Sequence, residues 1–137
     1  MATYAEVYAG VRTTIGAHAQ AQDDGRVEDM AAWYVPDAVM EIPGIATLKG
    51  PEAIAEAFTQ PGWRADQDHP QRHLVTNTVL TSWSDHEARA TSDVTLIRHD
   101  GSTWSIVIVA RYHDEFLQSD GRWLLRHRRD EYLAFQP

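Results

Sequence analysis

Seven histidines and twenty acidic residues give this chain many groups that can carry a proton, and the histidine at position 73 stands out by its place. It begins a run, residues 73–83, whose composition is typical of a β-strand. The period of two groups His73 on one face with Val75, Asn77 and Val79. An imidazole on an inner face would point into an apolar space and could accept a proton near neutral pH. A core histidine bonded to a backbone carbonyl is the alternative that the pattern leaves open.

A carboxylate near the end of the first predicted helix could complete a proton-transfer pair with this histidine. Asp23 lies beside the apolar stripe of that helix. Held against His73, it would fix the imidazole tautomer and raise the basicity of the ring. Asp24 is the competing candidate, because spacing alone does not separate two adjacent residues. A solvated carboxylate at the helix end is the simpler interpretation of either one.

Arg128 is the candidate for stabilising negative charge during a reaction. It lies in the last predicted strand, residues 122–132, on the face of Leu124 and opposite Leu125. An inward-facing guanidinium could stabilise the charge that develops on an enolate or a leaving group. The alternation does not say which face is internal, so a surface arginine remains the alternative.

The other histidines and the absence of cysteine limit the remaining chemistry. His69, His86 and His99 fall in predicted turns or loops, where a solvated histidine is expected. The run Asp66-Gln67-Asp68-His69 lies in a loop without a strand or helix to fix metal geometry. We therefore expect no metal ion and no cofactor. The lack of cysteine excludes disulfides, thiolate nucleophiles and cysteine-ligated zinc.

Length and composition predict a single domain over residues 1–137, with 43% apolar residues available for a core. The formal charge of −8 argues against nucleic acid, whose phosphates require a basic face. No apolar run approaches the length of a membrane span, and the first ten residues lack the features of a secretory signal. We therefore expect a cytoplasmic protein that binds neither nucleic acid nor membrane.

The order of the predicted elements indicates an α+β fold. Helical periodicity predicts helices over residues 3–23, from residue 27 until Pro36 ends the pattern, and over 51–58, with a strand at 38–42. An aperiodic loop, 59–71, has the length often found in lids. Four strands joined by hairpin turns follow at 73–83, 87–98, 103–117 and 122–132. Helices packed on one face of a strongly curved, mostly antiparallel sheet would leave a cavity for a small ligand.

Several segments resemble the SnoaL-like group of the nuclear transport factor 2-like superfamily, in the same order and with similar spacings over nearly the whole chain. They are Asp23-Asp24-Gly25-Arg26, Trp33-Tyr34, Asp37-Ala38, residues 44–51, residues 72–77, residues 105–116 and Asp120-Gly121-Arg122-Trp123. The likeness is greatest to the hexachlorocyclohexane dehydrochlorinase and scytalone dehydratase-like branch. The resemblance implies a cone-shaped sheet closed by three helices, with an Asp–His dyad inside.

Carried over residue by residue, the resemblance assigns the dyad aspartate to Asp23, because no gap is then needed before Asp37-Ala38. It assigns the dyad histidine to His73 and the pocket arginine to Arg128. Further substrate contacts are expected at His18, Asn77, Asp93, Trp33 and Tyr34. The chain departs from the dehydratases where they carry pocket tyrosines: Gln22 precedes the aspartate, and His18 lies one turn earlier. His18 could donate a hydrogen bond in place of that tyrosine.

The predicted function is a cofactor-independent lyase acting on a small hydrophobic cyclic substrate. His73 would remove an acidic C–H proton, Asp23 would support the imidazolium, and Arg128 would stabilise a departing hydroxide or halide. The same dyad would serve an isomerase or a polyketide-type cyclase. A non-catalytic ligand-binding or assembly subunit, as in the small subunits of ring-hydroxylating dioxygenases, is the alternative from another class.

Exposed apolar residues on such a cone predict self-association. We expect a homo-oligomer, either a trimer or a dimer. The contacts expected to be buried are Trp104, Ile106, Ile108 and Tyr132-Leu133-Ala134-Phe135.

Overall fold

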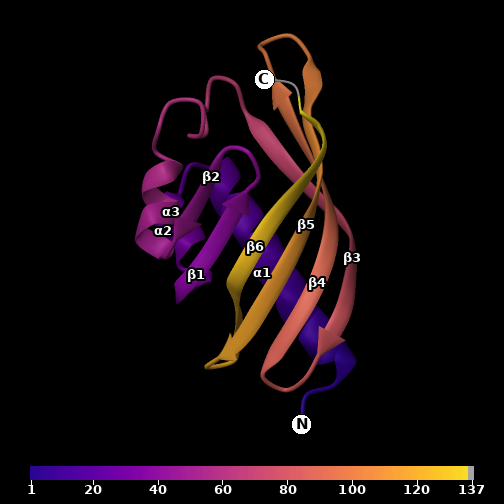
Figure 1. Ribbon diagram of the computed structural model, residues 1–137. Coiled ribbons are helices and arrows are strands. Elements are labelled where there is room, and N and C mark those ends of the chain that lie inside the picture. Colours follow the sequence, from indigo (N-terminus) through magenta and orange to yellow (C-terminus); the bar gives the residue numbers. More distant parts are fainter. Residues whose placement is uncertain (136–137) are drawn as a thin grey trace.

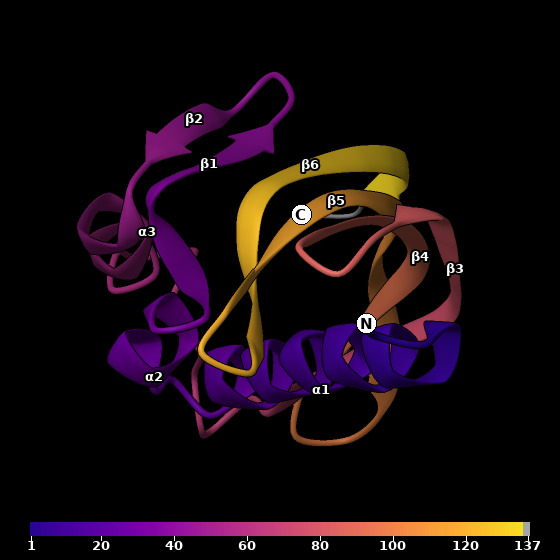
Figure 2. The same cartoon turned by 90° about the horizontal axis from the view of Figure 1, so that it is seen from below.

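The computed structural model describes residues 1–135, and of Phe135 only its place in a strand. The helices are α1 (Tyr4–Asp23), α2 (Val27–Ala31) and α3 (Pro51–Ala57). The strands are β1 (Tyr34–Ile42), β2 (Ala46–Lys49), β3 (Gln71–Trp83), β4 (Glu87–His99), β5 (Trp104–Ser119) and β6 (Arg122–Phe135). Within this part of the chain the strands form one sheet in the order β2-β1-β6-β5-β4-β3 (Figure 1). Figure 2 shows the sheet curling over α1, as expected for a cone of α+β type.

Helix α1 begins and ends where local chemistry requires. Thr3 and Glu6 form a capping box, in which each side chain accepts a hydrogen bond from the other residue's backbone N–H. Gly25, with φ of 75°, takes the left-handed conformation just after the helix. The buried stripe of Val7, Val11 and Ile15 packs α1 onto the sheet. In the described residues no helix is both long and apolar enough to cross a bilayer.

Two pairings could not be expected from the local pattern. Strand β2 is too short for a visible period, and it forms a hairpin with β1 through a turn at Gly44. Strand β1 also runs parallel to β6, the exception in a sheet whose other neighbouring strands are antiparallel. This parallel pairing joins residues about ninety positions apart, with Met40 opposite Arg128. It brings the predicted pocket arginine beside the apolar residues of β1.

A β-bulge in β3 reverses the alternation that the sequence indicated. Thr76 lies opposite Asp93 and Val79 lies opposite Thr91, so an extra residue is inserted between them, and Asn77 has φ of 53°. Since an inserted residue turns the rest of the strand to the other face, Asn77 and Val79 point outward. The predicted common face of these two residues with His73 is therefore wrong.

A second bulge, in β6, decides which residues enter the interior. Phe116 pairs with Leu125 but Glu115 pairs with His127, which leaves Arg126 as the extra residue. Leu125 is buried before the bulge and Arg128 is buried after it, although their positions differ by an odd number. The bulge thus lets an apolar first half and a polar second half of one strand both face inward.

Gly10 sets how closely α1 approaches β6. A methyl group on Gly10 would overlap the indole of Trp123, which is 6% exposed. One turn later, the Thr14 hydroxyl donates a hydrogen bond to the Trp123 carbonyl.

We expect Gly10→Ala to lower the free energy of unfolding by about 1–3 kcal/mol, because overpacking outweighs the gain in helix propensity. Gly16→Ala on the same helix meets nothing within 4 Å and should raise it by about 0.4–1 kcal/mol. Urea unfolding of both variants measures the difference. If both substitutions changed the free energy of unfolding in the same direction, this packing would be contradicted.

Candidate active site

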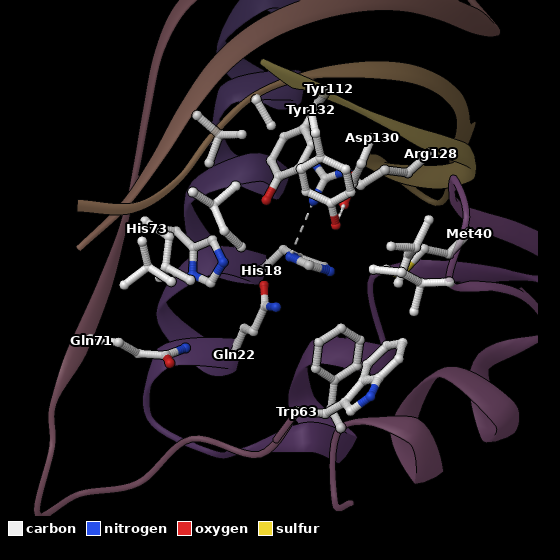
Figure 3. A pocket seen from close by; sticks show the side chains of 18 of the residues that line it. His18, Gln22, Met40, Trp63, Gln71, His73, Tyr112, Arg128, Asp130 and Tyr132 are labelled. Atoms are coloured by element: carbon white, nitrogen blue, oxygen red, sulfur yellow. Dashed lines mark hydrogen bonds between the residues drawn. The ribbon is translucent and has the colours of Figure 1, made fainter. Parts of the chain in front are cut away.

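A cavity of about 440 Å³ lies between the sheet, α1 and the loop that follows α3. Its walls are mainly apolar, and the ring of Trp63, from that loop, packs edge-on against Phe58 on the same wall. The polar side chains that line it come from α1, β3, β4, β5 and β6 (Figure 3). They are His18, Gln22, Gln71, His73, Arg98, Tyr112, Arg128, Asp130 and Tyr132. The space suits a small, largely apolar molecule held by few polar groups.

Asp23, the last residue of α1, and His73, near the start of β3, form a pair joined twice. Asp23 Oδ1 lies 2.6 Å from His73 Nδ1, and Asp23 Oδ2 accepts the His73 backbone N–H at 2.8 Å. Gln71 Nε2 adds a longer hydrogen bond to Oδ1. Asp24 instead is half-exposed and contacts Arg26. The structure thus places Asp23, and not Asp24, against the histidine.

The geometry of this pair selects one tautomer of His73. A carboxylate can only accept, so Nδ1 carries the proton that it donates to Asp23. The ring's other nitrogen, Nε2, then keeps its lone pair, and no other described residue occupies it. The side chains of His73 and Asp23 are 9% and 4% exposed, and His73 lines the cavity. A base is therefore present at the wall of an apolar space.

His18 lies at the centre of the cavity wall, where both of its ring nitrogens are engaged. Nε2 lies 2.8 Å from the Tyr34 hydroxyl, and Nδ1 lies 3.5 Å from Nη1 of Arg128. Because a guanidinium only donates, Nδ1 accepts and Nε2 donates to Tyr34. Burial, and next the Arg128 charge, hold the pKa of His18 well below its ordinary value. His18 lines the cavity as predicted, but its N–H is used by Tyr34 and not offered to a ligand.

Arg128 is buried at the cavity wall, in an ion pair with Asp114 of β5. Its Nε and Nη2 lie 2.8 and 3.0 Å from the two carboxylate oxygens, and the side chains are 2% and 0% exposed. The Tyr112 ring lies 3.7 Å from the guanidinium carbon. Burial acts to lower the pKa of Arg128, but Asp114 raises it overall. Since Asp114 balances its charge, Arg128 has little net charge left for a leaving group.

Asp130 is a site residue that the sequence analysis missed. Its Oδ2 accepts a hydrogen bond of 3.4 Å from the Tyr132 hydroxyl. Its Oδ1 is buried without a hydrogen-bond partner among the described residues. Burial raises the pKa of Asp130 to about 6. The signal was available: Asp130 lies two positions after Arg128, so an inward arginine predicts an inward carboxyl group.

Four residues expected to contact substrate lie elsewhere. Asn77 and Asp93 are on the outer face, where Asp93 accepts hydrogen bonds from Asn77 and Arg111, because the β3 bulge turns Asn77 outward. Trp33 packs against the guanidinium of Arg122 at 4.1 Å. Tyr34 is buried behind His18 and does not line the cavity. Tyr34 thus contributes through His18, and the other three predictions are contradicted.

Of the apolar residues expected at a subunit contact, some are exposed and others line the cavity. Trp104, Ile106 and Leu133 are 47%, 57% and 71% exposed. Ile108 and Tyr132 instead line the cavity. The side chain of Phe135 lies outside the described residues. Within residues 1–135, no three His, Asp or Glu side chains are grouped as metal ligands.

A comparison with protein-family models matches the SnoaL-like domain over residues 3–129. The chain belongs to the SnoaL-like family. No curated protein is significantly similar to it in sequence. An NTF2-like protein with a cystatin-like fold from Novosphingobium aromaticivorans has a TM-score of 0.85 at 21% identity, over 93% of this chain and 82% of the other.

Two further solved structures from the same organism share the fold of this SnoaL-like protein. A candidate scytalone dehydratase has a TM-score of 0.79 at 18% identity, over 93% of this chain and 84% of the other. The β subunit of a candidate aromatic-ring-hydroxylating dioxygenase has a TM-score of 0.81 at 18% identity, over 98% and 94%. At such identities the likeness concerns the fold, and the site must carry any functional argument.

The His18 ring should remain neutral, with its proton on Nε2, across roughly pH 5.5–7.5, where an ordinary histidine titrates. Nitrogen chemical shifts of the labelled protein measure this. His69 is an internal reference, because its hydrogen bond to Asp66 raises its pKa. Titration of His18 alongside His69 would contradict the hydrogen-bond assignment.

The raised pKa of Asp130 makes stability depend on pH. The folded state holds this proton more tightly than the unfolded chain, so the free energy of unfolding falls as pH rises from about 4 to about 6. Asp130→Asn should therefore be more stable than wild type near pH 8, by on the order of 1–3 kcal/mol, and no more stable below about pH 4.

Urea unfolding across this pH range tests the Asp130 effect. Asp93→Asn is the matched control, because Arg111, and next Asn77, lower the pKa of Asp93. Removing that carboxylate should destabilise the protein at neutral pH, the opposite sign. A stability difference for Asp130→Asn that does not vary with pH would refute the assignment.

Proposed function

We propose that this SnoaL-like protein is a cofactor-independent lyase that uses His73 as a general base on a small hydrophobic cyclic substrate. One observation carries the proposal: a histidine joined twice to a buried aspartate, with its other nitrogen at the wall of an apolar cavity. His73 Nε2 takes an acidic C–H proton, and the Asp23 carboxylate stabilises the resulting imidazolium.

The surroundings of the pair favour this role. The mainly apolar walls lower the polarity around the pair, which strengthens the Asp23–imidazolium interaction. Gln71 bridges Asp23 and Arg98, since it donates to the carboxylate and accepts from the guanidinium at 3.3 Å each. This bridge gives Asp23 a second side-chain donor from β3, besides His73. Positioned general-base catalysis contributes roughly 10²–10⁴-fold to a rate.

The reaction that follows removal of the C–H proton depends on the substrate. With a hydroxyl or halide one carbon away, proton removal expels that group, which is the elimination chemistry of the dehydratase and dehydrochlorinase-like branch. Without such a group, returning the proton elsewhere makes the protein an isomerase, and attack on a second carbonyl makes it a cyclase. We favour elimination, because the segments that hold Asp23 and His73 resemble the dehydratase and dehydrochlorinase-like branch residue by residue.

The likeness to the dioxygenase β subunit supports a second candidate, an assembly subunit without chemistry of its own. That role gives no reason for a buried carboxylate–imidazole pair beside an open cavity. Stable co-purification with a large iron-containing partner, together with wild-type association of a His73 variant, would favour it.

A tetralone with a hydroxyl group β to its ketone tests the lyase, since loss of water yields a naphthol that absorbs and fluoresces. His73→Gln should lower the enzymatic rate by roughly 10²–10⁴-fold, because the amide does not accept the proton. Asp23→Asn should also lower it strongly, because the imidazolium loses its counter-charge.

Asp24→Asn is the matched control for Asp23→Asn, because it removes the neighbouring, half-exposed carboxylate. It should keep the wild-type rate, and thermal unfolding shows whether each variant is folded. Full activity of folded His73→Gln, or equal losses for the two aspartate variants, would refute the base assignment.

A further inference from the structure

A second proton-carrying group faces the same cavity from β6, three places along the curved sheet from β3. His73 lies on β3 and Asp130 on β6, strands that β4 and β5 separate in the sheet order. Because the sheet curls, both side chains line one cavity (Figure 3). An imidazolium at His73 acts electrostatically on the Asp130 carboxyl group, so the two are within reach of each other's charge. Asp130 is the only acidic residue among the described residues that line the cavity.

The charges around Asp130 are already balanced without it. Arg128, its neighbour on the same face, is neutralised by the two oxygens of Asp114. His18 accepts from Arg128 and is neutral. Asp130 is thus left without a dedicated cation, and its Oδ1 is buried without a hydrogen-bond partner among the described residues. A buried carboxyl group in this position is favoured in its neutral form, which has a proton to donate.

We propose that Asp130 is the general acid of the reaction and protonates the leaving oxygen while His73 removes the C–H proton. The inference rests on the proposed lyase function and adds its second half. The C–H bond breaks toward His73 Nε2, the electron pair forms the carbon–carbon double bond, and the C–O bond breaks. The departing oxygen takes the Asp130 proton and leaves as water. The His73 imidazolium then loses its proton to solvent, and Asp130 takes up a proton from solvent.

This division of roles explains why the cavity contains an arginine that is already paired. Arg128 and Asp114 form a buried ion pair that also binds His18, and His18 in turn binds Tyr34. None of these contacts needs to gain or lose a proton. A substrate that loses hydroxide requires a proton at its oxygen, whereas one that loses chloride does not. The proposal therefore predicts that the contribution of Asp130 depends on the leaving group.

Two tetralones test this dependence, one with a hydroxyl group and one with chlorine at the carbon β to the ketone. Both lose the same C–H proton and give the same naphthol. Asp130→Asn should lower the rate of the hydroxyl compound by roughly 10²–10⁴-fold and that of the chloro compound by far less. Asp130→Glu, which keeps a carboxyl group, should restore part of the loss. Asp93→Asn, a carboxylate outside the cavity, should match wild type on both.

The pH profile gives a second measurement. For the hydroxyl compound, the wild-type rate should fall above about pH 6 as Asp130 loses its proton, and this limb should be absent for the chloro compound. The titratable groups that surround Asp130 come from α1, β3, β5 and β6: His18, His73, Tyr112, Asp114, Arg128 and Tyr132. Since the chloro compound meets the same groups, a difference between the two profiles isolates the acid step.

The outcomes separate the two proposals. Equal losses on both compounds would make Asp130 a structural residue, and no loss on either would exclude it as the acid. In either case, if His73→Gln loses both reactions, the assignment of His73 as the general base stands. Full activity of folded His73→Gln would instead refute the assignment of His73 as the general base. A wild-type protein that accelerates neither elimination beyond buffer would overturn both.

Discussion

The two hydrogen bonds that His73 donates to Asp23 fix the position of the histidine at the cavity wall. A carboxylate at the C-terminal end of a helix is opposed by the helix dipole, and its burial removes it from water. Asp23 tolerates this position because the backbone and ring of His73 and the amide of Gln71 surround it with donors. The same bonds attach the end of α1 to the start of β3. One buried charge therefore closes that side of the cone and orients the base within it.

The polar groups in the cavity fall into two sets with different electrical properties. In the first set, Asp23 and His73 can share a proton, and the guanidinium of Arg98 reaches the carboxylate only through Gln71. In the second, Arg128 and Asp114 neutralise each other, and His18 stays neutral beside them. Removing either member of that ion pair would leave an uncompensated buried charge. The second set therefore supports the cavity wall without exchanging protons. Asp130, which lies two positions after Arg128, is the nearby group that can exchange one.

Sheet irregularities determine how these two sets meet. Strongly curved sheets need bulges, and each bulge also exchanges the inner and outer faces beyond it. In β3 the bulge follows His73 and Val75, so the base stays inside while Asn77 turns to the surface. In β6 it precedes Arg128 and brings in a polar segment after an apolar one. The features that give the cone its curvature thus also select its active-site side chains.

Family membership and fold similarity leave the chemistry open. Solved structures described as a candidate dehydratase and as a dioxygenase subunit resemble this chain about equally well, with TM-scores of 0.79 and 0.81. The same cone can therefore enclose a catalytic site or serve assembly. The buried Asp23–His73 pair at the cavity wall is the observation on which the proposed lyase, and not an assembly role, rests.

The amino-acid pattern alone indicated the three helices and five of the six strands, but it missed β2 and continued α2 into the start of β1. It made Asp23 and His73 candidates without deciding that they pair. Caps, turn residues and periodicity are local properties, so the ends of α1 and of the four long strands were predicted to within three residues. Family resemblance then chose Asp23 over Asp24. Tertiary structure decided which strand faces are internal, the parallel pairing of β1 with β6, and the neutralisation of Arg128 by Asp114. Each of these features depends on an inserted residue or on a partner far away in the sequence. The alternation of side chains along a strand carries no information about either. The raised pKa of Asp130 belongs with them, because it arises mainly from burial.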